Sequence, residues 1–340
     1  MNFMEKRAVK ISLILAIIIV VIISFSLSIG EIMLSPVMVI KSILGIEKGF
    51  SSILVNDIRL PRVLVAFFVG ASLSLSGAIL QGVIRNPLAS PNVLGIVDGG
   101  AVGALVFLTI FMDPKNNSLK ISIFYMPIFT FVFSFLALII IYLLVVKSYS
   151  RNRIIIIGIG VSAIFKAITN ILIVNGPVVF IKESALWTTG SIYGANWPQA
   201  ILIGSWFFIF SLITIIFTRE LNIQQMEDNL ITSLGGNVKK SRFILLSISA
   251  ALGAGAVTIG GGISFVGLIA PHIARKLCDS KFENMIPLSI FIGGIITLLA
   301  DFSSKWLFYP EDLPIGVFTA AIGAPYFIYL LIKSRRRQIS

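Results

Sequence analysis

Three polar side chains interrupt one long apolar stretch of the sequence. Ser162, Lys166 and Asn170 are spaced four residues apart, so they share one face if this stretch is helical. A lysine at membrane depth is costly unless it reaches water or a counter-charge. The stripe therefore either lines an aqueous pathway, where its cation would favour an anionic solute, or Lys166 reaches the outer surface or pairs with Asp98 or Asp301.

Small and polar residues also share a face in a second apolar stretch. Steps of four, four, three and four residues separate Ala66, Gly70, Ser74, Gly77 and Gln81, which is helical spacing. Small residues at this spacing allow two membrane helices to pack closely. The other interpretation is that Ser74, Gly77 and Gln81 line an aqueous pathway, and the two can hold on different turns of one helix.

The sequence lacks the residue sets that most catalytic and metal sites need. It has one histidine, His272, and one cysteine, Cys278, which excludes a multi-histidine metal centre and an internal disulfide. The phosphate-binding pattern G-x-x-x-x-G-K-[ST] is absent, so this chain is not itself a P-loop ATPase. We therefore expect no cofactor, no resident metal and no enzymatic activity, and we assign His272 no catalytic role.

The composition indicates a membrane protein. Of 340 residues, 57% are hydrophobic and only 12% are charged, against about 25% charged in a typical soluble domain. These values exclude a soluble enzyme and a disordered chain. The long apolar runs are typical of helices that span a lipid bilayer, which need about 20 residues each. The net charge of +12 is expected from cytoplasmic loops, not from nucleic-acid binding.

We expect an all-α integral membrane protein with about ten spanning helices in a single domain, residues 1–340. The first apolar run is too long for a signal-peptide core and is interpreted as a retained span. The expected spans are 11–29, 62–83, 93–112, 122–146, 154–174, 199–218, 241–259, 263–277, 285–306 and 315–333. The eighth is short and rich in small residues, so we expect it to be partly buried in protein.

The positive charges predict the orientation of the chain. If the N-terminus is cytoplasmic and the spans alternate, 18 Lys and Arg residues lie inside, 8 lie outside, and Lys166 lies within a span. Because Lys and Arg collect in cytoplasmic loops, we expect a multi-pass cell-membrane protein with both termini in the cytoplasm. Intramembrane acids are scarce apart from Asp98 and Asp301, which argues against an ion-coupled secondary transporter. No clustered reactive side chains favour a membrane enzyme.

Six motifs carry a resemblance to a known family. They are RLPR at 59–62, SGAxxQ at 76–81, RNPLASPNVLG at 85–95, SFVGLIAPHIAR at 264–275, LLAD at 298–301 and LPIGVFTAAIGAPYF at 313–327. From about residue 59 to residue 331, the chain resembles the permease family of iron-chelate and vitamin B12 importers of the ATP-binding cassette (ABC) class. The resemblance implies a ten-helix permease of the type II importer class. It also implies a second permease subunit, two cytoplasmic ATPase subunits and an extracytoplasmic binding protein.

The resemblance gives the polar segment 221–238 a role. In the family, two short helices between spans six and seven fit a groove on the ATPase. The matching candidates for ATPase coupling are Leu221, Gln225, Glu227, Ser233, Leu234 and Gly235. Glu227 fits the family acid only loosely, because the family reads LG-E-x-x-A-x-x-LG where this chain reads QMEDNLITSLG. A plain solvated loop is the alternative.

Three cations are expected on the outer side, against the general trend of the charges. They are Arg59, Arg62 and Lys305. By resemblance they match cations that pair with acids on the binding protein, and ordinary anchoring at the membrane interface is the alternative. The expected function is that of an ABC importer permease for a ferric siderophore complex. Cobalamin or haem is the alternative cargo, and an ion-coupled secondary transporter is the alternative from another class.

Overall fold

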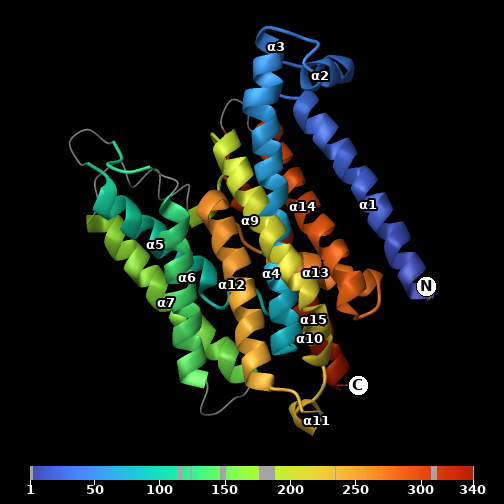
Figure 1. Cartoon of the computed structure of the whole chain (residues 1–340), viewed down its shortest axis with the longest axis vertical. Helices are drawn as coiled ribbons and strands as arrows, with labels where there is room; N and C mark the ends of the chain where they lie inside the picture. The colour runs from blue at the N-terminus through green and yellow to red at the C-terminus, as the bar shows by residue number, and fades with distance from the viewer. Residues whose placement is uncertain are drawn as a thin grey trace.

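The structure is a computed structural model that describes residues 3–113, 118–122, 125–145, 151–175, 188–233, 235–307 and 312–339. This part of the chain is almost entirely helical, and the longer helices run roughly side by side (Figure 1). They are α1 (Phe3–Ser28), α4 (Leu60–Ile84), α5 (Ile96–Phe111), α6 (Met126–Val145), α7 (Arg151–Asn175), α9 (Trp197–Ile216), α12 (Val238–Gly260), α14 (Phe282–Leu307) and α15 (Ile315–Ile339).

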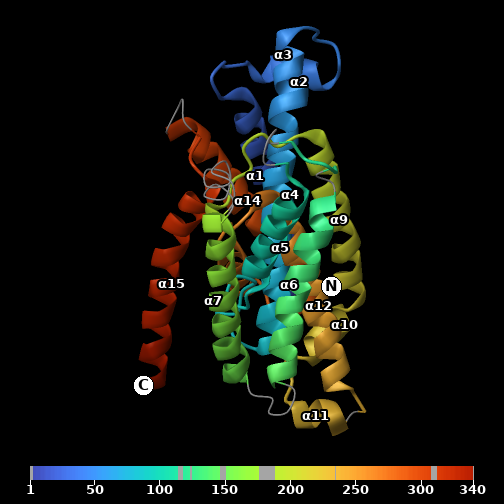
Figure 2. The ribbon, with the colours of Figure 1, turned by 90° about the vertical axis from the view of Figure 1, so that its left-hand side faces the viewer.

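Short helices occupy the two ends of the bundle. At one end lie α2 (Pro36–Ile43), α3 (Phe50–Ile53) and the π-helical segment η1 (Leu54–Arg59), which runs directly into α4. At the other end lies α11 (Asp228–Ser233), preceded by α10 (Thr218–Ile223). Figures 1 and 2 show both chain termini in the half of the molecule that contains α11.

The prediction of an all-α fold with about ten spans is confirmed. In the described residues, seven helices are long and apolar enough to cross a membrane, and α5 and α15 contain shorter apolar helices. The eighth predicted span is α13 (Val266–Leu277), with 12 residues. Its first half is buried, as its small residues predicted. Each predicted span therefore corresponds to one helix.

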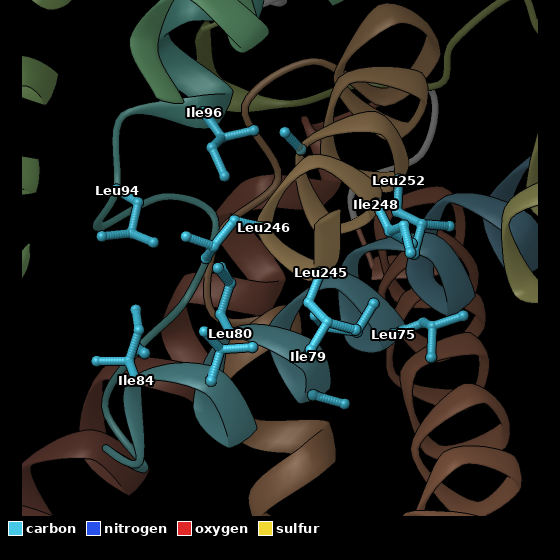
Figure 3. Close-up of a cluster of buried hydrophobic side chains, with 14 of the residues drawn as sticks. Leu75, Ile79, Leu80, Ile84, Leu94, Ile96, Leu245, Leu246, Ile248 and Leu252 are labelled. Atoms are coloured by element: carbon cyan, nitrogen blue, oxygen red, sulfur yellow. The ribbon is translucent and has the colours of Figure 1, made fainter. Parts of the chain in front are cut away.

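Helix α4 forms the centre of the bundle. Of the 18 most apolar consecutive residues in the 35-residue helical stretch that ends with α4, 83% are buried. The corresponding share in α1 is 22%. Helices α9, α12, α13 and α14 all pack on α4. Figure 3 shows the apolar contact with α12, where Ile79 and Leu80 of α4 lie close to Leu245 and Leu246. A displacement of α4 or α12 therefore has to move much of the core.

Glycines let the backbones of this centre approach closely. A Cβ atom added to Gly77 would lie 1.7 Å from the carbonyl oxygen of Gly267 in α13. One added to Gly70 would lie 2.4 Å from the carbonyl oxygen of Gly293 in α14. Neither distance leaves room for a methyl group, so glycine is required at both positions.

Candidate functional site

The three outer cations predicted from the sequence lie around one cavity of about 380 Å³. The cavity is also bordered by Glu31 and Asp312. Its charged lining comes from the turn after α1, from η1 and α4, from α14 and from the segment before α15. Segments distant in sequence thus build one charged site at the α2–α3 end of the bundle.

Two of these cations are bound to acids of the same chain. Arg62 donates to Asp301 at 2.8 Å and to Asp312 at 2.7 Å. Lys305 lies 2.7 Å from the second oxygen of Asp301. Asp301 is fully buried, so it requires these counter-charges. Two cations and two acids balance each other in this network.

Arg59 has a different kind of partner. It is 7% exposed, and its guanidinium donates to the backbone carbonyls of Leu27 at 2.5 Å and Ile32 at 2.6 Å. It therefore holds the turn that follows α1 against η1. All three cations have partners within the chain, and their role in docking a binding protein stays a prediction.

The predicted polar face of α4 is enclosed by protein. The Ser74 hydroxyl donates to the Ser289 carbonyl at 2.6 Å, and the Gln81 amide donates to the Leu268 carbonyl at 3.0 Å. Gly77 lies against Gly267. These contacts match the interpretation of close helix packing, while the assignment of this face to a translocation pathway stays a prediction.

The polar stripe of α7 includes a counter-charge from α5. Ser162 donates to Asp98, and the Lys166 amine lies 4.0 Å from the other Asp98 oxygen. Of the two acids proposed for Lys166, Asp98 is therefore the one beside it, and Asp301 pairs elsewhere. The Lys166 side chain is 66% exposed, whereas that of Asp98 is 16% exposed. Asn170 is exposed on the same helix.

The segment expected to meet the ATPase contains two short helices, α10 and α11, as the resemblance implied. Leu221 is fully buried, and the Gln225 amide donates to the Ser280 carbonyl at 3.0 Å. Glu227 and Ser233 are exposed. Leu234 lies outside the described residues.

The turn after α11 depends on Gly235. Its φ is +79°, in the left-handed region that glycine adopts without strain. Its N–H donates to the Thr232 carbonyl at 3.0 Å. A turn is therefore present at Gly235, and its role in coupling stays a prediction.

The acid that anchors this segment is not among the residues predicted from the sequence. Asp228, adjacent to Glu227, accepts two hydrogen bonds from Arg242 of α12, at 2.7 and 2.9 Å. It accepts a third from Arg85, at 2.7 Å. The hydrogen bonds from Arg242 lower the pKa of the Asp228 carboxyl most, and the nearby charges of both arginines add to this effect. The only signal in the sequence was an acid next to Glu227 in this polar segment.

Comparisons with known proteins agree with this architecture. The model of the FecCD transport family matches residues 17–333. This chain belongs to the FecCD transport family. As a FecCD permease, it is a multi-pass membrane protein and a transport subunit of an ABC importer, and it is not an enzyme. ABC importers of this kind act with ATPase and binding-protein partners.

Two curated relatives of this FecCD permease come from Bacillus subtilis (strain 168). The first, "Probable siderophore transport system permease protein YfhA", is 39% identical over 97% of this chain and 96% of its own length. The second, "Iron(3+)-hydroxamate import system permease protein FhuG", is 38% identical over 93% of this chain and 94% of its own length.

A solved structure shares the fold of this FecCD permease. It shows a metal-chelate type ABC transporter in an inward-facing conformation, with a TM-score of 0.82 and 29% sequence identity. The match covers 95% of this chain and 99% of the solved chain.

Proposed function

We propose that this chain carries a ferric siderophore complex across the cell membrane. The observation that supports this proposal is its similarity, over nearly its whole length, to permeases named for siderophore and iron(3+)-hydroxamate transport. The complex contains two ATPase subunits, a second permease subunit and an extracytoplasmic binding protein. The second permease is an identical or a homologous chain.

The charge distribution supports a cytoplasmic location for the end that carries α11. The predicted inside segments hold 18 of the 27 Lys and Arg residues. The α11 end also exposes two large apolar side chains, Met226 at 47% and Leu230 at 52%. Exposed apolar residues of this size, set among polar ones, are typical of a protein interface. We assign this surface to the ATPase and both termini to the cytoplasm.

The opposite end carries the binding-protein site in this proposal. The cavity there is lined by Arg59, Arg62 and Lys305, together with Glu31 and Asp312. Charged residues at the rim of an interface speed the encounter of two proteins and orient them, and this effect weakens as the salt concentration rises. Since the cations already have internal partners, the binding protein's acids would have to share them. Lys305→Gln should weaken binding-protein affinity more at low salt than at high salt, and equal affinities at both salts would contradict this role.

The pathway in this proposal follows the polar stripe of α7, in which Lys166 and Asn170 are exposed and Ser162 is buried. Because Asp98 is mostly buried behind it and Lys166 is exposed, the face that a solute meets is cationic. Such a face favours an anionic ferric chelate over neutral cobalamin.

The test is uptake by the reconstituted complex. The purified permeases and ATPases are placed in vesicles with the binding protein, and ferric hydroxamate, ferric citrate and cobalamin are offered separately. ATP-dependent uptake of a ferric chelate is expected. Uptake of cobalamin alone, or uptake driven by an ion gradient without ATP, would contradict the proposal.

A further inference from the structure

One carboxylate joins the short-helix segment to two core helices. Asp228 is the first residue of α11, and both of its oxygens are engaged by arginines from outside the segment. Arg242 belongs to α12, and Arg85 directly follows α4. A guanidinium that grips both oxygens of a carboxylate fixes orientation as well as distance. The contact therefore constrains α11 against two helices at once.

The same arginines also hold the residue at the other side of the turn. Arg85 donates to the Gln224 carbonyl at 2.5 Å, and Arg242 donates to the Gln224 side-chain oxygen at 3.0 Å. The side chain of Arg85 is 10% exposed and that of Arg242 is 4% exposed. Two buried guanidinium groups thus bind residues on both sides of the turn between α10 and α11. We call Arg85, Arg242, Gln224 and Asp228 the arginine clamp.

The arginine clamp is connected through the chain to the polar stripe of α7. Arg85 has φ +54°, in the left-handed region, and it begins the connection from α4 to α5. The first turn of α5 carries Asp98, which contacts Ser162 and Lys166. A movement of Asp228 can therefore reach the stripe through one short connection and one helix.

A separate set of contacts anchors the segment elsewhere. Asn222 donates to both oxygens of Glu283 at 2.8 and 2.9 Å, and it accepts from the N–H of Phe282 at 3.0 Å. These bonds join α10 to the start of α14 without involving α4 or α12. The segment would thus stay attached to the bundle if Asp228 lost its charge.

We propose that Asp228 is the positioning residue through which ATPase movement reaches α4 and α12, and that the adjacent Glu227 has no part in it. The inference rests on the proposed function, because it requires an ATPase against α11. Glu227 is exposed, and within the described residues its carboxylate makes no hydrogen bond or ion pair. The two neighbouring acids therefore form a matched pair for mutation.

The experiment compares Asp228→Asn with Glu227→Gln in the complete complex in vesicles. Both variants should retain their ATPase subunits at parental amounts. For Asp228→Asn, we expect at least a tenfold fall in ferric chelate taken up per ATP hydrolysed, while hydrolysis continues. Glu227→Gln should keep the parental ratio. Arg242→Lys keeps the charge but cannot donate to both carboxylate oxygens in the fork geometry of arginine. Its ratio of chelate taken up to ATP hydrolysed should lie between those of the other two variants.

A second readout needs no cargo. Spin labels are attached at Asn229 on α11 and at Ile156 on α7, both exposed, in chains that carry Cys278→Ser. ATP should change the distance between the labels in the parental and Glu227→Gln complexes but not in Asp228→Asn. A parental shift without any ferric chelate uptake would refute the proposed cargo and leave the linkage intact.

Four outcomes would overturn the linkage. The first is a parental uptake ratio and label shift in Asp228→Asn. The second is an equal loss in Glu227→Gln. The third is release of the ATPase by Asp228→Asn alone, because Asp228 would then serve the fold of the segment and not the transmission of movement. Absence of any label shift in the parental complex also contradicts the proposal.

Discussion

The contact between Gly77 and α13 gives the sharpest test of the central packing. Gly77→Ala would place a methyl carbon 1.7 Å from the Gly267 carbonyl oxygen. A methyl carbon and a carbonyl oxygen reach ordinary van der Waals contact at about 3.4 Å, so α4 and α13 would have to separate by more than an ångström. Backbone atoms on both sides prevent a side chain from relieving the clash.

The expected loss of stability in Gly77→Ala has two contributions. Overpacking of a tight core costs about 1–3 kcal/mol. Separation of the helices also strains the bond from Gln81 to the Leu268 carbonyl one turn away, which contributes about 0.5–1.5 kcal/mol. The higher helix propensity of alanine offsets at most about 1 kcal/mol of this loss of stability. We expect a net loss of about 0.5–3.5 kcal/mol.

The matched control is Gly160→Ala on α7. An added Cβ there meets no atom within 4 Å, so only the propensity gain applies. Thermal unfolding of the purified chain in detergent should show a midpoint several degrees lower for Gly77→Ala, and an unchanged or higher midpoint for Gly160→Ala. Equal midpoints for Gly77→Ala and the parental chain would refute the packing described here.

Four further predictions concern charges and one turn. Asp301→Asn should lower the stability of the chain by about 3–5 kcal/mol, measured by unfolding, because it removes the buried charge that both Lys305 and Arg62 bind and leaves Arg62 with Asp312 alone; a parental midpoint would contradict the network. Gly235→Pro should uncouple the ATPase, because proline cannot adopt φ +79° or donate its nitrogen, and normal co-purification and uptake would refute this. Lys166→Met should reduce uptake of anionic ferric chelates and spare assembly; parental uptake, or a cationic natural cargo, would contradict it. The pKa of the Asp228 carboxyl is lowered in the folded state, so the stability that its charge contributes is complete above about pH 4 and disappears as the pH falls through the lowered pKa. The difference in unfolding midpoint between the parental and Asp228→Asn chains should therefore be constant from about pH 8 to pH 5. It should shrink below about pH 4.

The spanning helices could be predicted because their signal is local. A run of apolar residues long enough for a bilayer is visible without knowledge of its neighbours. The short helices α2 and α3, with 8 and 4 residues, have no such signal. Ser35 caps α2, and Pro36 begins it, but a cap and a proline are also common in loops.

Partners distant in sequence could not be predicted in the same way. Arg62 and Asp301 are 239 positions apart, and Arg85 and Asp228 are 143 apart. The sequence identified the outer cations but not the acids that neutralise them. At the other end it favoured Glu227, because the family pattern places an acid near there. Only the fold shows that the neighbouring Asp228 contacts both arginines.

The most direct test of the account is ATP-dependent uptake of a radioiron-labelled siderophore by vesicles that contain the whole complex. The comparison is an ATPase variant that binds ATP without hydrolysing it. We expect uptake only with hydrolysis and only when the binding protein is on the side of α2 and α3. Uptake that persists without hydrolysis, or without the binding protein, would contradict the assignment of this chain as a ferric siderophore importer permease.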